Sequence, residues 1–258
     1  FTSRMHQWPH PQYFFKALSN ILRHHQASYV RIEQLDFNAH FISNLDSAMK
    51  GQRVEHLECD KLKCSGITND VRLSFAKLLK KVRTADLRKS KEITSLINED
   101  FLMDISNSTL ENFCCEFSPN LVQVYRFHPR AALISQISRM RTLYATAMVL
   151  DANTAMNLIL MRLDKNSRGR WHFSVNQQLS LNIVNQHLRS SNYEVCASRF
   201  SPRGGLHHIL ENKVNRHTTR LSTWKYSMDD EDMHVIDIQF YNFQHVNKDD
   251  LFHDYYLN

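Results

Sequence analysis

The sequence predicts an α/β fold built from repeated strand–helix units, and three observations lead to this prediction. In four segments an apolar residue is followed by others three and five positions later, a pattern we call the apolar frame. The segments start 22, 28 and 28 residues apart, near the period at which one strand and one helix stack into an array. Helix-like sequence precedes or follows each of them. The four segments are Ile32/Leu35/Phe37, Val54/Leu57/Cys59, Val82/Ala85/Leu87 and Leu110/Phe113/Cys115.

The helices of the first half are predicted from apolar residues at helical spacing. Phe14, Leu18 and Leu22 share one face of a helix over residues 13–25, which is expected to cap the array. A second helix follows the first strand and stops at Gly51. A third one precedes the strand at Val82. The N-cap candidates are Asn38 for the second helix and Thr68, Asn69 or Asp70 for the third.

The alternation continues through the second half and ends in a hairpin. Leu221/Trp224/Tyr226 and Met233/Ile236/Ile238 match the frame only 12 residues apart, too close for an intervening helix, so they are predicted to pair and close the array. We therefore expect a capping helix over 1–29, an array over 30–218, and a closing hairpin with an acidic tail over 219–258. The elements expected before the hairpin are a helix from Pro129 through Ile137, a frame at Met140/Leu143/Ala145, a helix over Ala152–Leu163, a strand over Trp171–Val175, a helix over Gln177–Arg189, a strand over Tyr193–Phe200 and a helix over Leu206–His217.

The apolar frame is that of leucine-rich repeats. In these repeats the first, fourth and sixth positions enter the core, while the residues between them stand out on the sheet. Asparagine or cysteine normally follows at the ninth position and hydrogen-bonds the turn. The ninth positions here are His40, Leu62, Ser90 and Ser118, so the sequence predicts an irregular leucine-rich-repeat-like solenoid.

The frames over 30–37 and 53–59, each tied to a helix and a variable loop, resemble the divergent repeats of nematode F-box-associated proteins. The resemblance extends in style over residues 12–243. It implies a substrate receptor of a cullin-RING ubiquitin ligase, in which an F-box contacts a Skp-type adaptor and the repeats hold the target. The segment from Trp8 to His25 supplies one helix where an F-box needs three, so an F-box would have to precede the chain.

Composition argues against several classes of enzyme. Five glycines in 258 residues leave no GxxxxGK[ST], GxGxxG or GxSxG motif, so nucleotide enzymes and common hydrolases are not expected, nor is a cofactor. Apolar runs are too short to span a bilayer, and no secretion signal opens the chain. Five cysteines without regular spacing favour a reducing intracellular compartment, cytoplasmic or nuclear.

Charge is unevenly placed along the chain. Residues 229–258 carry eight acidic residues and one basic residue, Lys248, which gives this segment a net charge of −7. Because the whole chain has a net charge of +6, the first 228 residues carry +13. The densest basic run indicates nucleic-acid binding through phosphate contacts as an alternative function, although a solvated face of a repeat is the simpler interpretation. The run consists of Lys77, Lys80, Lys81, Arg83, Arg88, Lys89 and Lys91.

Cysteine and histidine clusters suggest two metal sites that compete with simpler roles. His56, Cys59 and Cys64, with Cys114 and Cys115, match the ligand types of zinc. Cys59 and Cys115, however, occupy inward frame positions, which favours a core role. His207, His208 and His217 resemble the paired histidines of metal nucleases, but helical spacing over 206–217 would place the first two at the surface.

These observations together predict a non-enzymatic module that binds another protein through the outward positions of its strands. The acidic residues in the first two strands suggest a partner with basic or hydrogen-bonding groups. The predicted contact residues are Glu33, Gln34, Asp36, Glu55, His56, Glu58, Arg83, Thr84, Asp86, Glu111 and Asn112.

Overall fold

The chain has a mixed α/β fold that divides into two compact units, residues 1–118 and 119–258, and each unit is described by itself. The boundary falls inside the stretch that was expected to form one array. The computed structural model describes residues 11–25, 28–33, 38–51, 54–63, 66, 68–90, 96–106, 110–115, 134–135, 137–165, 168–201, 204–228 and 231–240.

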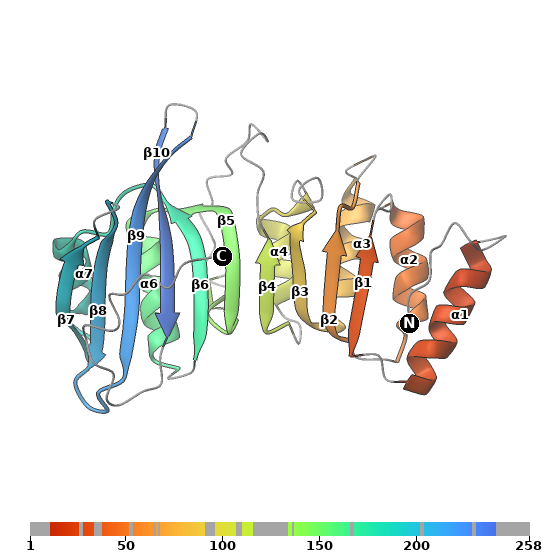
Figure 1. Ribbon diagram of the computed structural model, residues 1–258, viewed down its shortest axis with the longest axis horizontal. Helices are drawn as coiled ribbons and strands as arrows, with labels where there is room; N and C mark the ends of the chain where they lie inside the picture. Colours follow the sequence, from red (N-terminus) through yellow and green to blue (C-terminus); the bar gives the residue numbers. More distant parts are fainter. Residues whose placement is uncertain are drawn as a thin grey trace. The chain divides into compact units, whose positions relative to one another are not determined.

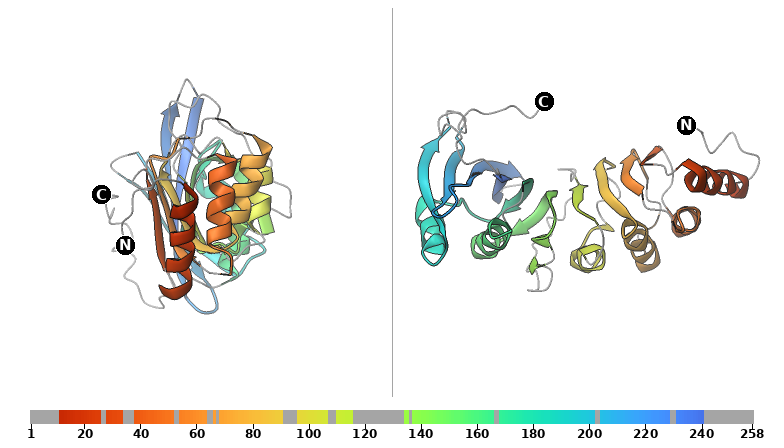
Figure 2. Two further views of the ribbon diagram at one scale, coloured as in Figure 1. Left: turned by 90° about the vertical axis from the view of Figure 1, so that its right-hand side faces the viewer. Right: turned by 90° about the horizontal axis from the view of Figure 1, so that it is seen from below.

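The first unit alternates helices and parallel strands. Its strands hydrogen-bond side by side in chain order, β1-β2-β3-β4. Helices α2, α3 and α4 lie on one face of these strands (Figures 1 and 2). The elements are α1 (Pro11–His25), β1 (Tyr29–Glu33), α2 (Ala39–Ala48), β2 (Val54–Asp60), α3 (Asn69–Leu79), β3 (Val82–Lys89), α4 (Glu99–Ser106) and β4 (Asn112–Cys115).

Side-chain caps fix the starts of two helices as predicted. The Asn38 side chain accepts a hydrogen bond from the Phe41 amide at 2.9 Å, and Thr68 accepts one from the Val71 amide at 3.2 Å. Thr68 is thus the N-cap among the three candidates for α3. Gly51 ends the turn after α2 with a φ of +76°, a conformation that glycine adopts without strain.

The apolar frame forms the core of the first unit. The frame residues of β2 and β3 are completely buried, and those around β4 are at most 7% exposed. Ile32 of the first frame is 6% exposed, while Leu35 and Phe37 lie outside the described residues. On the helix side, Phe75 of α3 packs against Phe101 of α4. The inward assignment of the first, fourth and sixth positions is therefore confirmed wherever the structure describes them.

The second unit contains a mainly antiparallel sheet with the order β5-β6-β10-β9-β8-β7. Only β5 and β6 pair in parallel, and α6 connects them. Helices α6 and α7 lie on the same face of the sheet (Figure 1). The elements are β5 (Thr142–Leu150), α6 (Ala152–Leu163), β6 (Gly169–Val175), α7 (Leu181–Leu188), β7 (Tyr193–Phe200), β8 (Leu206–Asn212), β9 (Thr218–Met228) and β10 (Glu231–Phe240).

One predicted element of the second unit is wrong, and most of another lies outside the described residues. Residues 206–217 form strand β8 and a turn, not a helix, and Val214, expected inside, is 78% exposed. Apolar residues at 206, 209 and 210 fit a helical stripe, but every residue of β8 is buried, so an interior strand satisfies them equally well. Most of the helix expected from Pro129 to Ile137 lies outside the described residues.

The predicted hairpin is confirmed, since β9 and β10 pair antiparallel from Thr219/Phe240 to Met228/Glu231. Its position differs from the expectation. Strand β10 does not close an end of the sheet but lies between β6 and β9, and it pairs with β6 from Gly169/Phe240 to Val175/His234. The hairpin is therefore part of the centre of the second unit.

Candidate protein-interaction surface

The strand face of the first unit opposite its helices carries polar side chains in cross-strand rows. One row runs Tyr29, His56, Thr84, Asn112 in the register of the four parallel strands. The Tyr29 ring stacks on the His56 ring, with centroids 5.0 Å apart and planes 18° from parallel. The Asn112 side-chain amide donates to the Thr84 hydroxyl at 2.9 Å. Contacts between neighbouring strands thus order this row.

The next row, Arg31, Glu58, Asp86 and Cys114, is dominated by paired charges. The Glu58 carboxylate accepts hydrogen bonds from the Tyr29 hydroxyl and from Lys89 Nζ, the latter at 2.8 Å. Asp86 binds the Arg88 guanidinium through both oxygens, with a shortest distance of 2.6 Å. The acids of this row are therefore neutralised by the protein itself.

Arg31 and Arg83 extend this pairing to the flanking positions. Arg31 forms ion pairs with Glu33 and, at 2.6 Å, with Asp60. Arg83 lies between Glu55 at 3.3 Å and Glu111 at 2.9 Å, so one guanidinium joins three successive strand segments.

The pairing shifts the ionisation of the two acids in the row. Hydrogen bonds from Lys89 and Tyr29 hold the pKa of Glu58 below its usual range. Burial opposes ionisation of Asp86, but the hydrogen bonds from Arg88 outweigh it, and its pKa is also lowered. Both side chains are charged at neutral pH, and both lie close to the sheet, with only 13% and 17% of their surface exposed.

The structure brings the described members of the predicted contact set together on this face. The Glu33, Glu55, Arg83 and Glu111 side chains are 39–51% exposed. Gln34 and Asp36 lie outside the described residues. The contact set predicted from the sequence does not include Tyr29 and Arg31. The sequence could have indicated them, because they occupy outward positions of the first strand in register with His56 and Glu58.

The basic run over residues 77–91 does not form one cationic surface. Lys77 and Lys81 contact Asp46 of α2 at 3.5 and 2.6 Å, on the helix side. Arg83, Arg88 and Lys89 belong to β3 and are engaged with the acids described above. Lys80 is exposed at the end of α3, and Lys91 lies outside the described residues. Five of these seven cations thus form ion pairs within the first unit.

A turn contact compensates for the missing asparagine at the ninth frame position. The Ser90 hydroxyl accepts a hydrogen bond from the Leu62 amide at 3.1 Å, and both residues are 1% exposed. Ser90 and Leu62 are the ninth positions of successive frames. The neighbouring Lys61 adopts a positive φ of 51° and donates its amide to the Lys89 carbonyl. A buried serine therefore hydrogen-bonds the preceding turn, a possibility that the sequence pattern alone did not bring out.

The cysteines of the described residues have structural environments. Cys59 and Cys115 are completely buried, which confirms their core role. Burial raises the pKa of the Cys59 thiol, and it raises that of Cys114 to about 11, so neither is a thiolate at neutral pH. Cys64 lies outside the described residues. No group of three or more His, Cys, Asp or Glu side chains within the described part of the chain has the geometry of a metal site.

The histidines of β8 are interior residues, not surface residues as expected. His207 and His208 are 2% and 0% exposed, and as successive strand residues they point to opposite faces of the sheet. His207 Nδ1 lies 2.7 Å from the Ser222 hydroxyl, whereas His208 hydrogen-bonds Ser198 and the Leu179 carbonyl. The side chains diverge, so they do not converge on a common metal with His217.

A polar row crosses the second unit through the partly exposed Tyr144 and the buried His172, Asp237, Ser222 and His207. Asp237 contacts Arg170 at 2.7 Å, Arg220 at 3.7 Å and His172 at 3.8 Å. Burial opposes ionisation of Asp237, but His172 and Arg170 outweigh it and lower its pKa. Ser222 has no exposed surface, so a substrate does not reach its hydroxyl in this conformation. The row is a structural network.

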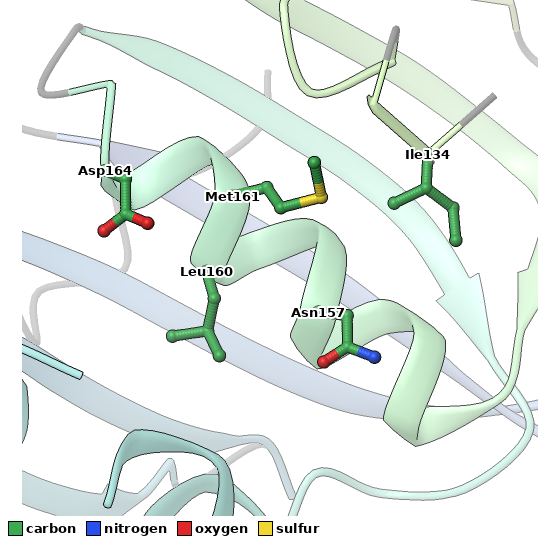
Figure 3. A pocket seen from close by; sticks show the side chains of 5 residues that line it. All are labelled: Ile134, Asn157, Leu160, Met161 and Asp164. Carbon is green, nitrogen blue, oxygen red and sulfur yellow. The ribbon is translucent and has the colours of Figure 1, made fainter. Parts of the chain in front are cut away.

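A hollow of about 460 Å³ lies on the second unit beside α6 (Figure 3). Its lining is Ile134, Asn157, Leu160, Met161 and Asp164. Among the described residues of this lining, Asp164 is the one ionisable side chain, and none is a nucleophile.

None of the described helices has the length and apolarity needed to cross a membrane. Comparison of the chain with protein-family models, with curated proteins and with solved structures finds no match. The function is therefore inferred from the residues themselves.

Proposed function

We propose that the chain is a non-enzymatic protein-binding module whose first unit is an irregular leucine-rich-repeat-like array. The partner would bind the strand face that carries the predicted contact residues. The observation that supports this most directly is the ordered polar row formed by Tyr29, His56, Thr84 and Asn112, flanked by paired charges. Stacking and cross-strand hydrogen bonds hold these side chains before a partner arrives, which lowers the entropy lost on binding.

The paired charges refine the kind of partner. Because Glu55, Glu58 and Asp86 already contact cations, the face does not present a strong acidic field to a basic protein. Recognition would depend on hydrogen-bonding and shape complementarity along the neutral row. Binding should consequently vary little with salt, whereas phosphate-driven binding falls steeply.

A more specific form of this proposal follows from the resemblance to F-box-associated proteins. In that form the first unit would hold a target for a cullin-RING ubiquitin ligase, and a Skp-type adaptor would bind if an F-box precedes the chain. The support is the parallel strand–helix sequence and the Ser90 turn contact, both of which suit a leucine-rich-repeat relative.

The test is affinity purification of the full chain from its source cell with a matched pair of variants. The triple variant H56A/T84A/N112A removes the neutral row. The control L73S alters a 56% exposed side chain of α3, away from the strand face. We expect the triple variant to lose the partner that the wild type and L73S both retain. Equal capture by all three proteins would contradict the proposed surface, and recovery of an adaptor with a cullin would support the ligase form.

A further inference from the structure

Most of the excess positive charge belongs to the second unit. Residues 119–228 contain 15 Lys and Arg against four Asp and Glu, a net +11, whereas residues 1–118 contain 16 against 14, a net +2. Residues 117–150 contain no acidic residue at all. The densest basic run in the sequence is therefore not the most basic region of the chain.

Five of these cations gather where β5 and β6 begin and α6 ends, and we call them the basic cluster: Arg139, Arg141, Arg162, Lys165 and Arg168. Lys165 Nζ donates to the Ser138 hydroxyl at 2.7 Å, which links the end of α6 to the segment before β5. Arg162 is only 3% exposed, and its Nη2 donates to the Arg168 carbonyl at 3.0 Å, so it supports the cluster from within while the other four cations are exposed. The Arg170 amide donates to the Arg141 carbonyl at 3.2 Å.

A close backbone approach at Gly169 keeps these segments together. A Cβ atom at this position would lie 2.1 Å from the Arg141 carbonyl oxygen and 2.9 Å from Arg162 Nη2. Only glycine allows the start of β6 to pass so near both groups. The cluster is therefore fixed by the fold and is not a chance meeting of mobile side chains.

The cations of the cluster act on one another. Burial and the charges of Arg162 and Arg139 lower the pKa of Lys165, and burial and Arg141 lower that of Arg162. Arg139, Arg141 and Lys165 form no ion pair with any acid in the described ranges. Asp151 caps the opposite end of α6, and the exposed Asp164 is the one acid within the cluster's own segment. The helix C-terminus favours nearby cations, but Arg139 and Arg141 come from a different segment.

A phosphate group is the ligand that fits the cations of the basic cluster. Guanidinium groups bind phosphate oxygens in bidentate geometry. Several cations on two segments suit a series of successive phosphate groups better than they suit a single phosphate group. The apolar residues interleaved with the cluster, Met140 and Trp171, are 2% and 0% exposed. They point inward, and Met161 of α6, 38% exposed, is the large apolar side chain that lies exposed next to a cluster residue. A single exposed methionine is less than the apolar face that lies beside cations on a membrane-binding surface. We propose that the basic cluster binds the phosphodiester backbone of a nucleic acid, independently of base sequence and of the protein-binding face.

The experiment measures fluorescence anisotropy of a labelled, mixed-sequence oligonucleotide of about 20 nucleotides, as RNA and as DNA, from about 50 to 200 mM salt. The cluster variant is R139Q/R141Q/K165Q. Its matched control, K61Q/K77Q/K80Q, removes the same number of charges from exposed positions of the first unit. Thermal unfolding of each variant verifies its fold. The single variants R139Q and R141Q, both at exposed positions, serve if the triple variant does not fold.

We expect the cluster variant to bind about 30-fold more weakly at about 100 mM salt, and the slope of log affinity against log salt to fall in magnitude by about two to three. The control should change affinity by less than about threefold, and each single variant should weaken it by about threefold. The proposal fails if the wild type does not bind at low salt, or if cluster variant and control weaken equally. It also fails if wild type binds anionic phospholipid vesicles but not the oligonucleotide.

Discussion

The two units treat positive charge in opposite ways. In the first unit Arg83 and Lys89 have acids on neighbouring strands, so a conspicuous basic run is cancelled within the fold. In the second unit Arg139, Arg141 and Lys165 form no ion pair with the described acids, and burial together with the charges of Arg162 and Arg139 lowers the pKa of Lys165. The difference teaches that the number of basic residues in a segment does not predict an anion-binding surface. Whether those residues can bind an anion depends on whether acids lie next to them on neighbouring strands.

The largest expected effect concerns Asp237, a buried acid with which the second unit does pair cations. Asp237→Asn should lower the free energy of unfolding by about 3–5 kcal/mol, because Arg170 and the buried Arg220 lose their countercharge. Urea denaturation measures this loss. Asp164→Asn, at an exposed position, is the control and should stay within about 0.5 kcal/mol of wild type. A similar loss in both variants would show that Asp237 is not specifically required.

A matched pair of charge reversals compares the two units directly. Arg83→Glu should lower stability, because it places three acids side by side, and salt should reduce the loss. Arg139→Glu should leave stability unchanged or raise it slightly, because it relieves repulsion with Lys165. Denaturant titrations at low and high salt provide the measurement. Equal losses in the two variants would remove the distinction between paired and unpaired cations.

The pH dependence of the first unit should reflect the pairing of Glu58. The folded state lowers its pKa, so its charged form stabilises the fold at neutral pH, and this contribution disappears as pH falls through the lowered folded-state pKa. Glu58→Gln should therefore be less stable than wild type by about 0.5 kcal/mol near pH 7. The gap should close as pH falls below the folded-state pKa, where both side chains are neutral. A constant gap in unfolding experiments across this range would contradict the assignment.

The smallest expected effect is at Lys165. Because this ammonium lies among other cations, Lys165→Met should keep the unfolding free energy within about 0.5 kcal/mol of wild type. Lys89→Met is the informative comparison, since it removes the partner of Glu58 and should be the less stable of the two. Differential scanning calorimetry ranks the two variants. The reverse ranking would place the favourable interactions in the second unit.

Local signals in the sequence predicted much of the first unit. Asn38 and Thr68 cap helices as expected, and the frame residues are buried wherever they are described. The cross-strand ion pairs were also accessible, because a 28-residue period places Glu55, Arg83 and Glu111 side by side. The binding role of this face stays a prediction.

Long-range pairing explains the failures in the second unit. The three apolar positions of 206–210 suit either a helix or an interior strand, and only the neighbours β7 and β9 distinguish the two. The contact between Arg170 and Asp237 joins residues 67 apart and repeats no period, so no local pattern indicates it. The same holds for the central place of β10. The basic cluster, in contrast, does have a local signal in the sequence, because residues 117–150 contain no acidic residue.

The central position of β10 has a consequence for synthesis on the ribosome. Each new strand of the first unit pairs with the strand made about 28 residues earlier, so that sheet can grow as the chain emerges. The second unit lacks the strand that joins β6 to β9 until residue 240 has left the exit tunnel. Until then β6 and β9 each present an open edge, and such edges are sites of aggregation. A nascent chain stalled shortly before β10 should therefore be the form most dependent on chaperones.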